Sequence, residues 1–145
     1  MDRRNIFRAV LASSAALLAG AHARADAASA TKVVYHLADA EKVSFVLGNL
    51  RNHLVGAGGS QAIRLAVAVH GPALSVFRRS GANVAVREDM LANVKDGVEF
   101  YACANTMAAQ KLTLGDLMPG FVVAEKGAVV LLADLQAQGW AYLRP

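Results

Sequence analysis

The chain has 145 residues, of which 55% are hydrophobic and 18% are charged, and this length fits one small globular domain. The composition excludes a disordered protein, because disordered chains carry more charge and fewer apolar side chains. No apolar run reaches the ~18 residues that a spanning helix needs, so we expect no membrane segment in the mature protein. The single cysteine excludes an internal disulfide and every CxxC zinc or redox motif.

Residues 1–27 have the pattern of an export signal. Arg3 and Arg4 stand ahead of two apolar residues, as they do in a twin-arginine signal, and a short stretch rich in Ala and Ser follows. Overlapping small-x-small sites at the end of the segment are typical of signal-peptide cleavage sites. The alternative is an ordinary secretory peptide in which the two arginines form the positive start. Either pattern predicts an exported, periplasmic protein whose domain spans 28–145.

The positive charge of the chain lies partly in this segment. The whole chain has a net charge of +4, and four arginines against two aspartates lie in 1–27, so the remainder carries +2. Arg78 and Arg79 form the only adjacent basic pair left. A nucleic-acid partner needs a larger basic surface, and we expect none.

The first half of the mature chain alternates between strand and helix patterns. A β-branched and aromatic run predicts a strand over 32–37. Asp39 can cap a helix whose apolar positions recur with the helical period, at Val43, Val46, Leu47, Leu50 and Leu54. The apolar run 63–69 predicts a strand that is buried on both faces. Pro72 then suits the first turn of a short helix through Phe77.

The next segment leads to the cysteine. We expect a short helix over 88–95 with three side chains facing inward, Met90, Leu91 and Val94. A third strand over 98–102 delivers Cys103. Either Asn105 or Thr106 can cap the short helix that follows.

The last segment completes an alternating pattern. Residues 113–116 have the spacing of a capping box, and 121–124 form a fourth strand. By composition 128–138 could be strand or helix, but its length and its polar residues favour a helix. A fifth strand follows over 140–143. This alternation predicts an α/β sandwich of three layers with a mainly parallel five-stranded sheet.

Three residues with reactive side chains stand at predicted strand ends, where ligands bind in open parallel sheets. His36, His70 and Cys103 lie at or near the carboxyl ends of strands one, two and three. A cysteine between a strand and a helix start can be a thiolate nucleophile, because helix N-termini lower the pKa of a thiol. A buried structural cysteine is the alternative. Each histidine could be a base or charge partner, or simply be bonded to the backbone.

Cofactor motifs are absent from the sequence. The two histidines with Cys103 could make a soft zinc or copper site, but their separations match no metal signature, so we predict no metal. The glycine cluster at 56–59 follows a helix and precedes a strand, the reverse of the dinucleotide-binding order. Gln61 also occupies the position where that motif needs its last glycine. We therefore expect no cofactor.

Three segments of the chain resemble the DsrE/DsrF-like family. They are Lys32-Val-Val-Tyr-His-Leu, Val69-His70-Gly71-Pro72 and Tyr101-Ala-Cys103-Ala-Asn105-Thr106-Met107, and the resemblance covers nearly all of 32–145. It implies a small flavodoxin-like α/β sandwich that assembles as trimers or hexamers. In some family members a cysteine at the end of the third strand accepts sulfur as a persulfide and passes it on, and Cys103 matches that position. Those members usually have Arg-Gly after the cysteine, where this chain has Ala108-Ala-Gln-Lys111.

The resemblance implies a periplasmic sulfur-handling protein with sulfurtransferase-like chemistry. Cys103 would be the nucleophile and persulfide carrier, with His36 or His70 stabilising the thiolate. Its partners would be sulfur donors and acceptors, either proteins or small sulfur compounds. One alternative is an oligomeric module that binds a small ligand or a metal without turnover, in which Cys103 is structural. A purely structural interaction subunit is another.

Overall fold

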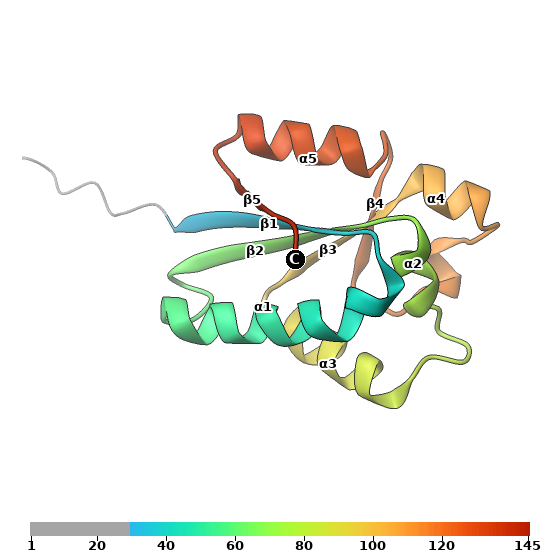
Figure 1. Cartoon of the computed structure of the whole chain (residues 1–145), viewed down its shortest axis with the longest axis horizontal. Coiled ribbons are helices and arrows are strands. Elements are labelled where there is room, and N and C mark those ends of the chain that lie inside the picture. Colours follow the sequence, from blue (N-terminus) through green and yellow to red (C-terminus); the bar gives the residue numbers. More distant parts are fainter. Residues whose placement is uncertain (1–29) are drawn as a thin grey trace, which may run out of the picture.

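The computed structural model describes residues 30–145 (Figure 1), so the predicted export segment lies outside the described residues. Five parallel strands form one sheet in the order β4-β3-β2-β1-β5. Along the chain they are β1 (Thr31–Leu37), β2 (Ile63–Val69), β3 (Glu99–Cys103), β4 (Phe121–Ala124) and β5 (Ala141–Leu143). The expected number of strands and their parallel arrangement are confirmed.

Helices cover both faces of the sheet and make three layers (Figure 1). One face carries α1 and α3, the other carries α5, and two short helices, α2 and α4, begin where β2 and β3 end. Their bounds are α1 (Val43–Ala57), α2 (Pro72–Val76), α3 (Val84–Lys95), α4 (Ala104–Ala109) and α5 (Ala128–Ala137), with 3₁₀ turns η1 (Ala40–Lys42) and η2 (Leu114–Asp116). The arrangement is that of a flavodoxin-like fold, as predicted. Within 30–145, no helix combines the length and apolar character that a membrane crossing requires.

The alternation of side chains along the strands divides the core in two. The larger cluster lies between the sheet and α1 and α3, and it includes Val33, Tyr35 and Leu37 of β1. The smaller cluster lies under α5, and its members are Val34, Ala66, Ala68, Cys103, Ala128, Leu132, Leu135 and Trp140. Cys103 therefore belongs to the layer between the sheet and α5.

The structure confirms the apolar stripe of the first predicted helix and corrects the next helix. Asp39 does not cap α1, because it precedes the 3₁₀ turn η1 without a side-chain cap hydrogen bond and α1 begins at Val43. All five apolar positions predicted for α1 are buried. However, α3 begins at Val84 rather than at residue 88, because the side chain of Asn83 accepts a hydrogen bond from the Ala85 amide at 2.9 Å and caps the helix. Met90 is buried as predicted, but Leu91 is 41% exposed and Asn93 is buried. The buried stripe of α3 consists of Val86, Met90 and Asn93, which share one helical face.

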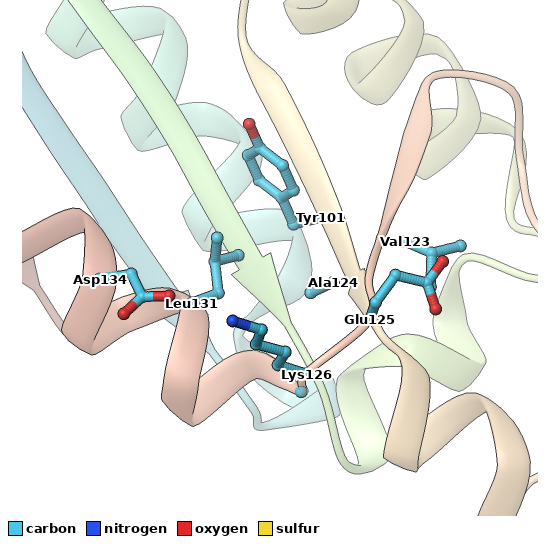
Figure 2. Close-up of a pocket in the computed structure, with 8 residues that line it drawn as sticks. Tyr101, Val123, Ala124, Glu125, Lys126, Leu131 and Asp134 are labelled. Atoms are coloured by element: carbon cyan, nitrogen blue, oxygen red, sulfur yellow. The ribbon is translucent and has the colours of Figure 1, made fainter.

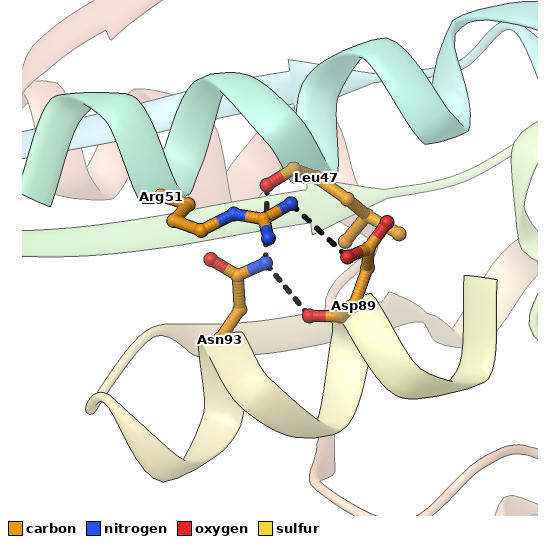
Figure 3. Close-up of polar contacts among 4 residues, drawn as sticks. All are labelled: Leu47, Arg51, Asp89 and Asn93. Carbon is orange, nitrogen blue, oxygen red and sulfur yellow. Dashed lines mark hydrogen bonds and ion pairs between the residues drawn. The ribbon is translucent and has the colours of Figure 1, made fainter. Parts of the chain in front are cut away.

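Asn93 joins α3 to α1 (Figure 3). Its Nδ2 donates to the carbonyl oxygen of Leu47 at 3.1 Å and to that of Asp89 at 2.8 Å. An ion pair between Arg51 and Asp89, at 3.0 Å, lies beside this contact on the surface. The amide hydrogens of this buried side chain have acceptors, whereas its Oδ1 is buried without a hydrogen-bond partner.

Two further boundaries differ from the expectation. Cys103 itself is the N-cap residue of α4, which begins at Ala104, so neither Asn105 nor Thr106 is the cap. Trp140 is buried ahead of β5, and the three residues of β5 are exposed. The predicted capping box is present, since the Asp116 carboxylate accepts from the Thr113 amide at 2.8 Å.

Candidate functional site

The three predicted site residues lie at the carboxyl edge of the sheet. His36 is two residues beyond Val34 on β1, so it projects on the α5 side, where Cys103 also lies. His70 follows β2 directly, and its amide donates to the Leu37 carbonyl at 3.0 Å. The order of strands therefore brings the residues to neighbouring positions on β1, β2 and β3.

Cys103 is held between the starts of two helices. It caps α4, and its Sγ accepts a hydrogen bond from the Ala128 amide, the first of α5, at 3.3 Å. The residue is only 5% exposed. Gly127 is so close that a Cβ there would lie 3.8 Å from Sγ. Peptide N–H groups at helix starts are unpaired within the helix, and they favour a negative charge on the sulfur.

Opposing effects act on the pKa of the Cys103 thiol. Burial raises it, because a charged sulfur loses its hydration. The donors around the sulfur lower it and together outweigh burial; they are the Thr106 amide, the Ala128 amide, the Thr106 hydroxyl and the Asn105 amide. Of these, the Ala128 amide donates a hydrogen bond to Sγ. The pKa of Cys103 is therefore below that of an ordinary cysteine, and a larger fraction of the thiol is ionised at neutral pH.

The position of Cys103 in the topology explains why both helices reach it. The connection after β3 leads to β4 at one edge of the sheet, whereas α5 leads from β4 back across the sheet to β5 at the other edge. The two connections leave the neighbouring strands β3 and β4 in opposite directions across the sheet, at the point where Cys103 is paired with Ala124. Such a divergence is where ligands bind in open α/β sheets. Sequence reasoning missed the contribution of Ala128, because it depends on the order of strands.

The two histidines contact each other directly. Their Nε2 atoms are 2.5 Å apart, and Nδ1 of His36 is hydrogen-bonded to the Tyr142 hydroxyl at 2.6 Å. Tyr142 was not among the predicted site residues. It reaches the site because β5 pairs with β1, which places Tyr142 beside Val34.

Both imidazoles have lowered pKa values. Burial lowers the pKa of His36 and His70, the positive Arg144 adds to the effect, and the pKa of His36 is also lowered by His70. The carboxylate of Asp39 acts in the opposite direction. Both rings are therefore mainly neutral at neutral pH.

The loop that carries His70 is bonded to the helix that Cys103 caps. The Gly71 amide donates to the Thr106 hydroxyl at 3.0 Å, and Nε2 of Gln110 donates to the Gly71 carbonyl at 2.9 Å. The groups that lower the pKa of Cys103 are peptide amides and Thr106, while the histidines are engaged with each other. The thiol and the histidine pair are thus neighbouring but separate units.

A pocket of about 220 Å³ lies between the sheet and α5 (Figure 2). Its lining comes from β3, β4, the turn after β4 and α5, and consists of Tyr101, Val123, Ala124, Glu125, Lys126, Gly127, Leu131 and Asp134. In Figure 2 the Lys126 side chain extends toward Leu131. Burial and a hydrogen bond to Glu99 raise the pKa of Tyr101 to about 12, so its hydroxyl stays protonated. Gly127 both lines the pocket and adjoins Sγ.

Within the described part of the chain, no group of three or more His, Cys, Asp and Glu side chains is placed to hold a metal ion. His36, His70 and Cys103 are therefore not arranged as a three-ligand centre. A closed tetrahedral zinc site needs four such ligands and a catalytic one needs three.

Solved structures of three proteins are similar to this chain. MTH1491 of Methanobacterium thermoautotrophicum, a protein of unknown function, is 29% identical with a TM-score of 0.70 over 79% of this chain and 99% of its own. BT1422 of Bacteroides thetaiotaomicron, also of unknown function, is 13% identical with a TM-score of 0.61 over 79% of this chain and 94% of its own. The ychN protein of E. coli is 15% identical with a TM-score of 0.59 over 80% of this chain and 99% of its own. No protein-family model matches the chain, and no curated protein matches its sequence.

These neighbours define the class of the domain. All three have the DsrE-like fold, and this chain shares it over most of its length. The fold expected from the resemblance is thus confirmed, and the single cysteine of the chain lies at the carboxyl edge of its sheet.

Proposed function

We propose that this chain is a periplasmic sulfur carrier in which Cys103 holds a sulfur atom as a persulfide. The observation that supports this function best is the placement of Cys103, which is the N-cap residue of α4 and whose Sγ accepts a hydrogen bond from the first amide of α5 at 3.3 Å. The same amides that lower the pKa of the thiol would stabilise a persulfide anion by the same interaction. The pocket between the sheet and α5 offers space for the donor or acceptor.

The transfer step is a displacement at sulfur. The Cys103 thiolate attacks the terminal sulfur of a donor persulfide, R–S–SH, and forms a new S–S bond. The S–S bond of the donor breaks, and its electron pair leaves on the donor as R–S⁻. Cys103 then carries –S–SH, and attack by an acceptor thiolate on the outer sulfur returns the Cys103 thiolate. The step needs no oxidant and no cofactor.

The mass of the intact protein tests this function. The full chain, purified without reductant, is exposed to polysulfide, and we expect a gain of one sulfur atom that dithiothreitol reverses. Cys103→Ser should gain none while keeping its circular dichroism spectrum. Loading that survives in Cys103→Ser, or no loading of a folded wild-type protein, would contradict the proposal.

A binding module without turnover is the second candidate, and the burial of Cys103 favours it. In that case the thiol fills the small cluster under α5 and does not react. Alkylation of the folded chain by iodoacetamide separates the two functions. A sulfur carrier should be labelled at neutral pH, whereas a structural cysteine should be labelled only after unfolding.

The periplasmic location rests on residues 1–27, which the described structure does not include. Export by the twin-arginine route requires the arginine pair. Replacing both with lysine (Arg3→Lys, Arg4→Lys) should leave the protein in the cytoplasmic fraction of cells that carry this pathway. Continued appearance in the periplasmic fraction would instead favour an ordinary secretory peptide.

A further inference from the structure

The two histidine rings face each other end to end. Their planes differ by only 20°, and their centroids are 4.8 Å apart, which is the Nε2 separation plus about one ring radius at each end. The proton or lone pair of each Nε2 is therefore directed at the Nε2 of the other ring. Two imidazole nitrogens in this position repel unless a proton or a metal cation lies between them.

We propose that His36 and His70 form a two-coordinate site for Cu⁺, with Tyr142 as the positioning residue for His36. Imidazole nitrogen is a suitable ligand for copper. Linear coordination by two neutral donors is a stable geometry for Cu⁺, a closed-shell ion, and it requires the end-to-end arrangement that these rings have. Zn²⁺ is disfavoured because it takes at least three protein ligands, and residues 30–145 offer no such group.

The surroundings of the pair suit ligation. The Tyr142 oxygen, 2.6 Å from Nδ1 of His36, can accept the Nδ1–H and so leave the Nε2 lone pair for the metal. Metal-bound histidines almost always have such a partner on the second nitrogen. The backbone of His70 is fixed by its hydrogen bond to Leu37.

Binding requires the rings to move apart. Two metal–imidazole bonds of roughly 2 Å each, placed in line, separate the Nε2 atoms by about 4 Å. Both histidines are only half-buried at the sheet edge, so rotation of their side chains toward solvent can provide this displacement. Copper would then lie on the same edge of the sheet as Cys103 without using its thiol.

Copper binding is measured in the full-length Cys103→Ser chain, so that the thiol does not contribute. A chromophoric Cu⁺ chelator, bathocuproine disulfonate, competes with the protein under anaerobic, reducing conditions. We expect one Cu⁺ per chain, with an X-ray absorption edge typical of two-coordinate copper. His36→Ala and His70→Ala should each lose at least tenfold in affinity, and Tyr142→Phe should lose about tenfold as expected for a residue that orients a ligand.

His53 provides the matched control. Its Nδ1 is 2.9 Å from the Tyr35 hydroxyl, so it is also a tyrosine-bonded histidine, but it faces no second imidazole. His53→Ala should leave Cu⁺ affinity unchanged. Equal affinity in the His36, His70 and His53 variants, or no Cu⁺ retained by the Cys103→Ser chain, would overturn the proposal. Because this test omits Cys103, its failure is distinct from a failure of sulfur loading.

Discussion

At the scale of single residues, Thr106 links the thiol to the loop of the histidines. Its hydroxyl oxygen accepts from the Gly71 amide at 3.0 Å, and its hydroxyl hydrogen can donate to Sγ of Cys103. A hydroxyl has one donor and two acceptor sites, so it can make both bonds at once. The ionisation of Cys103 therefore depends on peptide and hydroxyl donors rather than on a charged partner.

Removing this hydroxyl should raise the pKa of Cys103. Thr106→Val keeps the shape of the side chain but leaves the thiolate with one donor fewer. The pH profile of iodoacetamide alkylation should shift to higher pH, with slower labelling at pH 7. Thr106→Ser retains the hydroxyl and should keep the wild-type profile. Identical profiles for the valine and serine variants would show that the amides alone set the pKa.

The histidine pair should make the fold less stable in mild acid. Because both pKa values are lowered in the folded chain, the unfolded chain binds more protons as the pH falls below about 6.5. The contribution of the two histidines to the free energy of unfolding is therefore complete above that pH, and it is lost as the pH falls through the folded pKa values. In urea titrations between pH 7 and pH 5, His36→Gln/His70→Gln should lose less stability than the wild type. A parallel loss in both proteins would assign the pH dependence to other groups.

Among the elements, α1 and α3 are joined by one buried side chain and one surface ion pair. Asn93→Ala removes the donor to Leu47 and should lower the free energy of unfolding by about 1–3 kcal/mol, because a buried carbonyl loses its partner. Arg51→Ala breaks an exposed ion pair and should lower it by less than about 1 kcal/mol. Asn93→Asp should be worse than alanine at pH 7, since a carboxylate cannot donate to that carbonyl. Urea denaturation measures all three, and equal effects of Asn93→Ala and Arg51→Ala would contradict this account.

In the turn between β4 and α5, a side chain at Gly127 would meet the side chain of Asn105. Gly127 has φ +89°, and a Cβ there would lie 2.7 Å from Nδ2 of Asn105. Gly127→Ala should therefore destabilise the fold and force the Asn105 side chain, on α4 beside Cys103, to move. Gly139→Ala is the control, because Gly139 has a similar φ of +84° but nothing within 4 Å of its Cβ position. Gly127→Ala should lose more stability in thermal denaturation and should also change the alkylation rate, which Gly139→Ala should leave unaltered.

The elements differed in how far the sequence could define them. The strand runs and the stripe of α1 were predictable, because their apolar periods are regular. The start of α3 was missed, since its first residues, Val84 to Arg87, are mostly exposed and carry no helical stripe. The meeting of His36 with Tyr142 depends on the pairing of β5 with β1, which no local pattern specifies. The sequence thus indicated candidate residues along the chain, while the strand order determined which of them touch.

At the scale of the whole molecule, we propose that copies of the chain assemble through the side formed by β4 and α5. Val122 of β4 is 58% exposed and Val129 of α5 is 71% exposed, and β4 is an edge strand with one free side. Exposed apolar groups next to an open edge favour association.

Light scattering coupled to size exclusion tests this assembly. The wild type should have the mass of a trimer or hexamer, and Val129→Glu should shift it toward the monomer, because a charge would be buried in the contact. Val55→Glu is the matched control, as Val55 is 77% exposed on the opposite face, in α1. A monomeric wild type, or an equal effect of both glutamates, would exclude this interface.

The position of β5 has a consequence for synthesis of the protein. This strand pairs with β1 over three residues, although almost the whole domain separates them in the sequence. While the ribosome is still translating the intervening segments, β1 has one edge without a partner, and its neighbouring apolar side chains are uncovered until α5 docks. The nascent chain therefore passes through a stage in which a strand from another molecule can occupy the place of β5. Chaperones that bind extended apolar segments would protect β1 during that interval.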